Sequence, residues 1–533
     1  MCGIWAWIYK EKGSQTHEEL WKDVKGISAR GPEGARWLDM PNSTWCFTRL
    51  AINGLNEGAM QPFTWGSTWA WMCNGEIYNS KELEERIPYL PATGSDCEVL
   101  AALYESCQDS VSFARALDGV FALVLRKGDD YIVARDPYGV RPLFYMKSED
   151  GWRFASERKV LEPFAKDTCI YEFPPGEVWE LRPQDDFISV KKYRYHSTPW
   201  IKSVRDVNDI VLELTAAVEK RLMTERPVAA LLSGGIDSSL IAALVQKRLV
   251  ELGKPPLKTF SIGMEGGTDL AYARMVANWI GSDHTEIVVT EDDMFNAIPD
   301  VIRDIESYDI TTVRASVGNW LIAKKIRELT DCKVVFNGDG SDEVFGSYMY
   351  FYKAPTDDAF ELESERLLNE IHQYDVLRSD RCISSHGLEA RTPFLDKQFV
   401  ACARSYPTSL RRPGNGRMEK QVLRDAFKYT GLLPEAVLYR RKEAFSDGVS
   451  AKEKSWFEII QDKINKDVVP MGWREDAYAK NIWPAPPTQE AYYYRSIFDK
   501  LYPHTGGLWA YWMPRWSPET TDPSARTLVA EPA

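Results

Sequence analysis

The chain carries at residues 227–239 the stretch PVAALLSGGIDSS, which passes abruptly from apolar residues to glycine, serine and aspartate. Val228–Leu232 is a short apolar run, typical of a buried strand in a parallel sheet. The loop Ser233–Ser239 follows, and LIAALVQKRL (240–249) then has apolar residues at helical spacing. The order of strand, glycine-rich loop and helix indicates a phosphate site, because backbone N–H groups and the helix dipole favour negative charge there.

Asp237 distinguishes this loop from a Walker A loop, which has a lysine for the terminal phosphates. A carboxylate tolerates neighbouring phosphates only when a metal ion lies between them. An ordinary turn is the alternative, but it does not account for adjacent glycines, adjacent serines and an acid. The loop resembles the pyrophosphate loop of ATP pyrophosphatases, which cleave ATP between the α- and β-phosphates. The ATP ligands expected here are Ser233, Gly234, Gly235, Asp237, Ser238 and Ser239.

The composition excludes several classes of function. The chain has 533 residues, 44% of them hydrophobic, which is enough for two or three domains. Its formal net charge of −13 argues against nucleic acid as the main partner. We see neither an apolar run of about 18 residues nor a signal-peptide pattern, so we expect no membrane partner. Nine cysteines without a CxxC pair favour a reducing, cytoplasmic location and disfavour a cysteine zinc site.

The N-terminal third is predicted to be a mostly antiparallel sheet domain with helices packed on it. Strands are expected at Gly3–Tyr9, 44–52 and 70–79, and a hairpin with a Gly-Asp-Asp turn at 118–136. GSDCEVLAALYE (94–105) begins with serine and aspartate, which cap helices. Strands recur with few helices between them, which favours antiparallel pairing.

Cys2 directly follows the initiator methionine. Removal of Met1 would place a thiol and a free α-amine on one residue, and the ordinary pKa of that amine is about 7.7–8.0. The amine could then act as the base that activates its own thiol. A buried structural cysteine is the alternative.

Six stretches of the N-terminal third occur in the order found in class II glutamine amidotransferases: MCGI, RGPE, RLAI, NGEIYN, GSDCE and RDPYGVRPLFY. The resemblance implies an N-terminal-nucleophile glutaminase domain, an αββα sandwich that hydrolyses glutamine to glutamate and ammonia. Cys2 would be the nucleophile that forms a γ-glutamyl thioester, and Asn74 with the N–H of Gly75 would form the oxyanion hole. The implied glutamine ligands are Arg49 for the α-carboxylate, Glu76 and Asp96 for the α-ammonium group, and Leu50, Ala51, Ile52, Asn53, Asn74 and Gly75 around the pocket.

The loop ARGPE departs from this family, which usually has HRGPD. Ala29 and Glu33 replace residues that are expected to be structural. We expect the replacements to leave glutaminase activity intact and to bear on the local loop geometry.

Beyond residue 206 the pattern alternates between strands and helices. An amphipathic helix is expected within Asp206–Met223, and further strands at 257–264, 284–289 and 333–336. This order predicts a doubly wound parallel α/β sheet, with ligands at the carboxyl ends of its strands. We expect a glutaminase domain over 1–195, a linker over 196–206, a synthetase domain over 207–502 and a partly ordered tail over 503–533.

The stretch NGDGSDEVFGSY (337–348) places three acids after an apolar strand. Such a cluster is costly unless a cation or a substrate amine neutralises it, although a solvated acidic loop is the alternative. Asp237 and Asp342 could together hold Mg²⁺ on the pyrophosphate group, because Mg²⁺ prefers oxygen ligands. The further nucleotide contacts expected are Asn337 and Gly338, with Leu232 and Ile262 against the adenine ring.

The C-terminal half resembles the glutamine-hydrolysing asparagine synthetases. The resemblance rests on ESYDITTVRAS (306–316), GLEARTPFLD (387–396), GNGRMEKQVLR (414–424) and RRKEAFSDG (440–448). With the N-terminal motifs, it covers almost the whole chain, from Cys2 to about Tyr502. It implies aspartate ligands at Thr311, Thr312, Arg314 and, as an anchor or scaffold, Arg391, and a catalytic lysine at Lys442 that stabilises the phosphate charge.

One departure bears on the acceptor site. The family usually has SGEGSDE where this chain has NGDGSDE, so Asn337 and Asp339 replace a serine and a glutamate. Asp339, expected to be catalytic in adenylate formation, keeps the carboxylate but is one CH₂ group shorter. A placement error of about 1 Å can cost on the order of 10²-fold in rate.

The sequence therefore predicts an ATP-dependent amide synthetase with Mg²⁺ as cofactor. The β-carboxylate of aspartate would attack ATP to give β-aspartyl-AMP and pyrophosphate, and ammonia from glutamine would convert the adenylate to asparagine. Two alternatives stay open: a synthetase that adenylates another carboxylate, as β-lactam synthetases do, and a non-catalytic protein that kept the fold. The expected partners are glutamine, aspartate and ATP, and the formation of a homodimer stays open.

Overall fold

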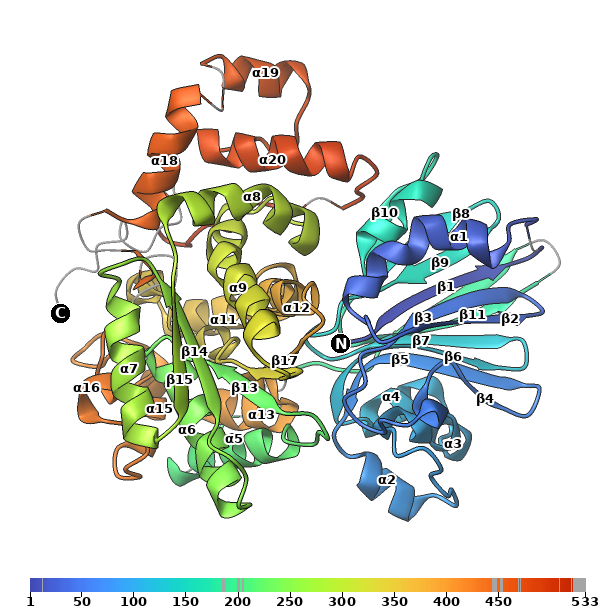
Figure 1. Ribbon diagram of the computed structural model, residues 1–533, viewed down its shortest axis with the longest axis horizontal. Coiled ribbons are helices and arrows are strands. Elements are labelled where there is room, and N and C mark those ends of the chain that lie inside the picture. Colours follow the sequence, from blue (N-terminus) through green and yellow to red (C-terminus); the bar gives the residue numbers. More distant parts are fainter. Residues whose placement is uncertain are drawn as a thin grey trace.

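The computed structural model describes most of the chain and shows two lobes, with the N-terminus at their junction (Figure 1). The described residues are 1–11, 13–184, 187–198, 202–203, 206–442, 448–450, 454–467, 469, 471–507, 509–518 and 520. Parts of the predicted linker (199–201 and 204–205), of RRKEAFSDG (443–447) and of the predicted tail (508, 519 and 521–533) lie outside them.

The N-terminal lobe contains two antiparallel sheets. Its strands are β1 (Gly3–Tyr9), β2 (Ala35–Met40), β3 (Ser43–Thr48), β4 (Phe63–Trp65), β5 (Trp69–Ile77), β6 (Gly119–Lys127), β7 (Asp130–Arg135), β8 (Phe144–Ser148), β9 (Gly151–Ala155), β10 (Ile170–Glu172), β11 (Glu177–Pro183) and β12 (Ile188–Arg194). One sheet has the order β10-β8-β9-β1-β3-β2, and the other has the order β12-β11-β7-β6-β5-β4. The predicted antiparallel pairing is confirmed.

Helices cover both outer faces of the paired sheets, which confirms the predicted αββα sandwich (Figure 1). Ile4 and Ile8 of β1 point into the core between the sheets. Trp5 and Trp7 point the other way, because successive strand residues alternate, and pack under α1. The helices of this lobe are α1 (His17–Val24), α2 (Ser80–Arg86), α3 (Leu100–Ser106) and α4 (Ser110–Ala116).

The second lobe contains a five-stranded parallel sheet. Its strands are β13 (Val228–Leu231), β14 (Lys258–Gly263), β15 (Asp283–Val288), β16 (Val334–Phe336) and β17 (Glu389–Arg391). Their order is β15-β14-β13-β16-β17, so the chain builds outward from β13 in both directions. The point where the direction reverses, between β13 and β16, is where open α/β sheets bind ligands.

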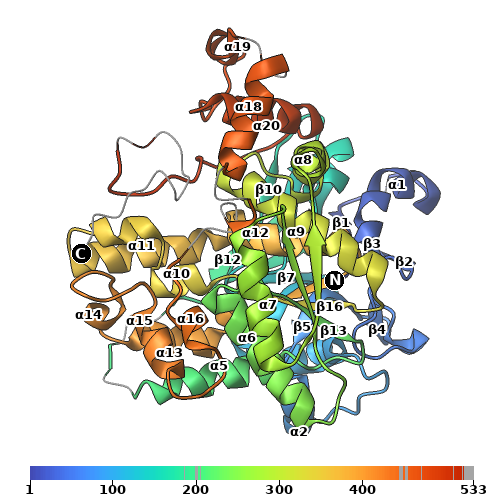
Figure 2. The ribbon, with the colours of Figure 1, turned by 60° about the vertical axis from the view of Figure 1, so that its left-hand side comes forward.

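Helices pack on both faces of this sheet, as a doubly wound fold requires. Helices α6 and α7 lie side by side on one face, and α9 and α12 pack on the opposite face, with α8 against α9 (Figure 2). The helices of this lobe are α5 (Asn208–Lys220), α6 (Ile236–Glu251), α7 (Thr268–Ile280), α8 (Glu291–Ile305), α9 (Ile310–Leu329), α10 (Ser341–Phe345), α11 (Asp357–Glu370), α12 (Asp375–Ser384), α13 (Lys397–Ser405), α14 (Thr408–Arg411), α15 (Gln421–Phe427), α16 (Glu435–Leu438), α18 (Trp456–Asp467), α19 (Trp473–Ala479) and α20 (Gln489–Leu501).

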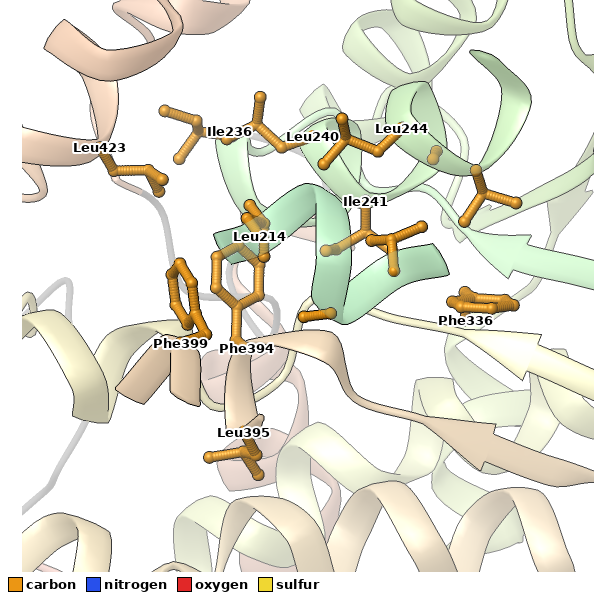
Figure 3. Close-up of a cluster of buried hydrophobic side chains, with 14 of the residues drawn as sticks. Leu214, Ile236, Leu240, Ile241, Leu244, Phe336, Phe394, Leu395, Phe399 and Leu423 are labelled. Carbon is orange, nitrogen blue, oxygen red and sulfur yellow. The ribbon is translucent and has the colours of Figure 1, made fainter. Parts of the chain in front are cut away.

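An apolar cluster holds the first turns of α6 in place (Figure 3). Leu240 and Ile241 are fully buried in it, together with Phe394 and Phe399. Phe336, the last residue of β16, belongs to the same cluster. The loop before α6 and the loop after β16 therefore rest on one core, which fixes their relative position.

The structure corrects two predicted elements of the N-terminal lobe. The predicted strand 44–52 ends at Thr48, and residues 49–53 instead form a loop that lines a pocket. The predicted helix in 94–105 begins with a 3₁₀ turn at Asp96–Val99, and α3 starts only at Leu100. In that turn the Asp96 carboxylate accepts a hydrogen bond from the N–H of Ile77, 2.7 Å away, which ties it to the end of β5.

The stretch after Tyr502, predicted to be ordered in part, makes contacts with both lobes. The N–H of Ile170 in the N-terminal lobe donates to the carbonyl of His504 at 2.9 Å. The N–H of Trp512 donates to the Asp309 carboxylate at 2.7 Å. The described part of this stretch thus packs against the N-terminal lobe and beside the start of α9.

Candidate active sites

Cys2 lies directly before β1, close to the loop that follows β3. Its Sγ atom is 3.5 Å from the N–H of Leu50, which donates to it, and 3.6 Å from the carbonyl of Leu50. The Arg30 side chain donates to the Cys2 carbonyl at 3.0 Å and fixes the backbone. The thiol therefore faces the segment predicted to line the glutamine pocket.

The surroundings of Cys2 require a base before the thiol can react. Burial raises the pKa of the Cys2 thiol to about 11, so the thiol is neutral at physiological pH. Burial also lowers the pKa of the Met1 α-amino group to about 6, against the influence of Glu389. That amine lies 4.0 Å from a Glu389 carboxylate oxygen. Removal of Met1 would transfer a basic amine in this buried region to Cys2 itself.

Asn74 is buried on β5, and neither polar atom of its side chain has a hydrogen-bond partner within the described part of the chain. An unsatisfied buried amide costs about 1–3 kcal/mol, so its presence favours a role toward a ligand. At the next position, a Cβ on Gly75 would lie 2.1 Å from the carbonyl oxygen of Val120, so only glycine fits there. The Asn74 amide and the backbone N–H of Gly75 are therefore suitable hydrogen-bond donors for an oxyanion.

The pocket beside Cys2 brings the predicted glutamine ligands together except Asn74, which is fully buried on β5 and does not line it. Arg49 is half-buried, and its guanidinium group donates to the carbonyls of Asn56 at 2.9 Å and of Gly54. These contacts hold the side chain at the rim, and burial lowers its pKa without removing its charge. The predicted residues that line the pocket are Cys2, Arg49, Leu50, Ala51, Ile52, Asn53, Gly75, Glu76 and Asp96.

Two buried carboxyls supply the negative charge of this pocket. Glu76 accepts from the Asn53 amide at 2.7 Å, and the Asp96 carboxyl lies beside the end of β5. Burial raises the pKa of both carboxyls, and each also lies near the negative charge of Glu389. A substrate ammonium group between them would relieve this cost, which supports the predicted role in binding the α-ammonium group.

Glu33, the acid that departs from the family pattern, has a definite structural role. Its carboxylate accepts from the N–H of Ala51 at 3.0 Å and pairs with Arg226 at 3.1 Å. It therefore braces the segment that lines the pocket and ties that segment to the second lobe.

Arg391 is not among the residues that line the large pocket of the second lobe, and its contacts agree with the anchor or scaffold role predicted for it. The side chain is buried, with its Nε atom 2.8 Å from Glu389 and an Nη atom 3.3 Å from Glu76. Its other Nη atom donates to the carbonyl of Met223 at 2.8 Å. Because these contacts occupy the guanidinium group, Arg391 is an anchor between the lobes.

Replacement of this anchor should affect stability before it affects aspartate binding. We expect Arg391→Ala to lower the melting temperature by several degrees, because it leaves Glu76 and Glu389 buried without their partner, at a cost of about 3–5 kcal/mol. Calorimetry would measure this, with the exposed Arg327→Ala as the matched control. A higher KM for aspartate in ammonia-dependent synthesis, with an unchanged melting temperature, would instead support a role in binding aspartate.

The predicted pyrophosphate loop forms one wall of a large pocket at the carboxyl ends of the parallel strands. Ser233, Gly235, Asp237 and Ser238 line this pocket. The Ser238 hydroxyl accepts from the N–H of Ser233 at 3.1 Å, which closes the loop on itself. Of the other predicted nucleotide ligands, Leu232, Ile262, Asn337 and Gly338 line the same pocket.

Two predicted nucleotide ligands do not line the pocket. Gly234 has φ +74°, and a Cβ there would lie 2.4 Å from the side chain of Tyr272, so the glycine permits contact with α7. Ser239 is fully buried in the first turn of α6. Their roles as nucleotide ligands stay predictions, while Gly234 allows the loop to approach α7 closely.

Asp237 and Asp342 lie on either side of one ammonium group. The Nζ atom of Lys420 is 2.5 Å from Asp237 and 2.6 Å from Asp342, and Lys442 also pairs with Asp342. Burial opposes the ionisation of Asp342, but the two lysines outweigh it and hold the pKa of this carboxyl well below its usual range. Lys420 is itself buried and has φ +58°, a conformation that costs energy outside glycine and often marks functional sites.

The same two carboxylates suit a magnesium ion. They provide oxygen ligands in the first turns of α6 and α10, within reach of one ammonium group, that of Lys420. Within the described ranges, no cluster of three or more histidine, cysteine, aspartate or glutamate side chains could hold a metal. Phosphate oxygens would therefore have to complete the coordination shell.

Asp339 lines the large pocket as predicted. Its carboxylate accepts from Arg378 of α12 at 2.9 Å. Burial raises the pKa of Asp339, and Arg378 works against this increase. The neighbouring Gly338 touches the start of α6, since a Cβ there would lie 2.7 Å from the backbone nitrogen of Ser238. The two loops of the site are therefore in direct contact.

The predicted aspartate ligands other than Arg391 lie at the start of α9, on the pocket wall. The hydroxyls of Thr311 and Thr312 donate to the Asp309 carboxylate at 2.6 and 2.9 Å. Arg314 is buried and forms two hydrogen bonds with Glu490, at 2.7 and 2.5 Å. The guanidinium group is thus held rigidly by a partner that lies 176 residues further along the chain.

Several residues of the large pocket or its support were not predicted from the sequence. Among them are Lys420, Arg378, Glu490 and Trp512. Lys420 stands in the quoted stretch GNGRMEKQVLR, so its motif was recognised while its role was not. The other three gave no local signal, because each reaches the site only through the packing of α12, α20 or the C-terminal stretch.

Comparisons with known proteins cover both lobes. The glutamine amidotransferase domain family matches residues 1–172, and the asparagine synthase family matches residues 210–364 and 353–526. The asparagine synthetase (glutamine-hydrolyzing) of Gallus gallus is 42% identical over 99% of this chain and 98% of its own length. Those of Cricetulus griseus and Homo sapiens are 42% and 41% identical, each over 99% of this chain and 99% of their own length.

Proposed function

This chain belongs to the family of glutamine-hydrolysing asparagine synthetases, and on that premise we propose how its two pockets make asparagine. It is a ligase that uses glutamine as the nitrogen donor. We assign the two half-reactions to different lobes because each lobe has its own pocket with suitable side chains. One is lined by the Cys2 thiol and by Gly75, which directly follows the buried Asn74 amide that has no hydrogen-bond partner in the described structure, and the other is lined by two carboxylates that pair with one ammonium group.

The pocket of the N-terminal lobe releases ammonia from glutamine. Cys2 attacks the side-chain amide carbon, and its thiol proton passes to the α-amine that removal of Met1 would expose. Asn74 and the N–H of Gly75 stabilise the oxyanion, an effect worth about 10²–10³-fold in rate per donor. Ammonia leaves, and water then hydrolyses the γ-glutamyl thioester to glutamate.

The pocket of the second lobe activates aspartate. The β-carboxylate attacks the α-phosphorus of ATP, the bond to the β-phosphate breaks, and β-aspartyl-AMP and pyrophosphate form. Lys442 and Lys420 form salt bridges with Asp342 and stabilise the negative charge of the departing pyrophosphate. Asp339 takes part in adenylate formation, and Thr311, Thr312 and Arg314 bind aspartate. Ammonia then displaces AMP from the acyl carbon.

The cofactor of the second pocket is Mg²⁺, held by Asp237 and Asp342. When bound, the ion supplies positive charge that screens the phosphate oxygens from these carboxylates. The contacts of Lys420 with both carboxylates support this assignment, because they show that the pair is arranged around one cation.

Ammonia reaches the adenylate through a protected passage between the lobes. It must arrive unprotonated, because ammonium has no lone pair with which to attack. Buried charge pairs at the junction support the exclusion of water: Arg30 lies 2.8 Å from Asp380, and Arg141 lies 3.6 Å from Glu389. The N-terminal residue Met1 is buried among apolar residues of the second lobe.

The domain boundaries are part of the proposal: a glutaminase domain over 1–195, a linker over 196–206, a synthetase domain over 207–502 and a tail over 503–533. The two family matches, over 1–172 and from 210 onward, support a boundary between the first two domains, whereas the second match continues to residue 526, into the proposed tail. We also propose a cytoplasmic location and keep the homodimer as a hypothesis. In the parts of the chain that are described, no helix is long and apolar enough to cross a membrane.

Pyrophosphate release with aspartate, combined with detection of asparagine, tests the proposal. We expect release to depend on aspartate and ATP, and asparagine to appear when glutamine or ammonia is added. A panel of other carboxylates should give release at least about tenfold slower, because the aspartate ligands discriminate by placed charges. Faster release with another carboxylate would favour the alternative acceptor, and the absence of both glutaminase activity and pyrophosphate release would favour a non-catalytic protein.

A further inference from the structure

Asn337 is buried at the end of β16, and its side chain turns toward its own loop. Its amide nitrogen lies 2.9 Å from a carboxylate oxygen of Asp339 and 2.5 Å from the hydroxyl oxygen of Ser379. Its backbone N–H donates to the carbonyl of Arg391 at 3.1 Å, within the parallel sheet. The side chain is therefore held between the loop and α12.

These contacts use both donors of the Asn337 amide. An asparagine amide has two N–H groups, and a carboxylate can only accept, so the nitrogen must face Asp339. The amide oxygen lies 3.4 Å from the N–H of Asp339, which closes a small ring within the loop. No side-chain donor of Asn337 is left for a nucleotide, in contrast to the role that the sequence suggested.

Asp339 is held from two directions. One oxygen accepts from Asn337 and the other from Arg378, both at 2.9 Å. Arg378 is itself fixed, because its other nitrogen pairs with Asp375 at 2.7 Å on the same helix. With Arg378 alone, the carboxylate could rotate about that single contact, whereas the second contact from Asn337 defines its direction.

We propose that Asn337 is a positioning residue that orients the Asp339 carboxylate for formation of the acyl adenylate. The proposal rests on the proposed function, in which Asp339 acts in that step. It explains why this chain departs from the family pattern at both positions at once. An asparagine reaches one bond further than a serine, and an aspartate is one CH₂ group shorter than a glutamate. The longer Asn337 side chain therefore reaches the shorter Asp339 carboxylate, and the effects of the two residues depend on each other.

A double-mutant cycle tests whether the effects of Asn337 and Asp339 are coupled. We expect Asn337→Ser and Asp339→Glu each to reduce kcat for aspartate-dependent pyrophosphate release by about 10²-fold, since each misplaces the carboxylate by about 1 Å. The combined variant N337S/D339E should recover to within about tenfold of the unmodified protein. The KM for ATP should change less than about threefold in Asn337→Ser, because the amide makes no nucleotide contact in the proposal.

Two further measurements and two further variants keep the outcomes distinct. Glutaminase activity and melting temperature report folding, and Asn337→Ala serves as a second variant if the serine variant is unstable. The exposed Asn369→Ser is the matched control and should match the unmodified protein. Additive losses in the double variant, or a raised KM for ATP with an unchanged kcat, would overturn the positioning role. No aspartate-dependent release from the unmodified protein would overturn the proposed function itself.

Discussion

Replacement of Cys2 by alanine should abolish glutamine-dependent asparagine synthesis while ammonia-dependent synthesis continues. The variant removes the only thiol that contacts the backbone of Leu50 in the described structure, and with it the atom that would form the γ-glutamyl thioester. We expect the glutamine-dependent rate to fall by about 10⁴-fold or more, as for other lost nucleophiles. The rate with saturating ammonium salt near pH 8 should stay within about twofold of that of the unmodified protein. Detection of glutamate, pyrophosphate and asparagine measures glutamine hydrolysis, adenylate formation and asparagine synthesis, respectively.

The control for this variant is Cys107→Ala, which removes another half-buried thiol away from the pocket. This variant should still synthesise asparagine with either glutamine or ammonia as the nitrogen source. A Cys2→Ala protein that is folded but fails with ammonia as well would refute the division of the reaction between two pockets. Intact mass provides an independent check, because the mature protein should lack Met1. A retained methionine would exclude the α-amine of Cys2 as the base.

Replacement of Asp237 by alanine should stop pyrophosphate release while glutaminase activity continues. Asp237 and Asp342 share the ammonium group of Lys420, and the same pair would hold Mg²⁺ against the pyrophosphate group. Loss of one carboxylate removes a ligand from that ion. We expect release to fall by at least about 100-fold, since even residues outside the coordination shell often cost 10–100-fold when replaced. Chelation of divalent ions should have the same selective effect, and added Mg²⁺ should restore release.

The matched control is Asp331→Ala, which removes an exposed aspartate just before β16 in the same lobe. It should leave both activities within about twofold of the unmodified protein. If Asp237→Ala releases pyrophosphate normally, the acidic pair is not the metal site. If chelation stops glutaminase activity too, the metal acts on the N-terminal lobe or on the whole fold, and its assignment to this pocket is wrong.

The apolar patterns of the sequence were sufficient for the architecture. Gly3–Tyr9, rich in Ile, Trp and Tyr, predicted a strand, and β1 buries Ile4 and Trp5 on its opposite faces. The run Val228–Leu232 predicted a buried strand of a parallel sheet, and β13 is such a strand, in the middle of its sheet. Such patterns are local consequences of strand and helix periodicity, so they can be recognised without the tertiary structure.

The sequence alone also predicted which motifs bear the chemistry, including Cys2, SGGIDSS and NGDGSDE, because their spacing along the chain is local. It did not determine which side chains meet. Only the tertiary structure placed Lys420 between Asp237 and Asp342, moved Arg391 to the junction of the lobes and turned Gly234 toward α7. Contacts between residues more than a hundred positions apart depend on how helices and loops pack, and local periodicity carries no information about that packing.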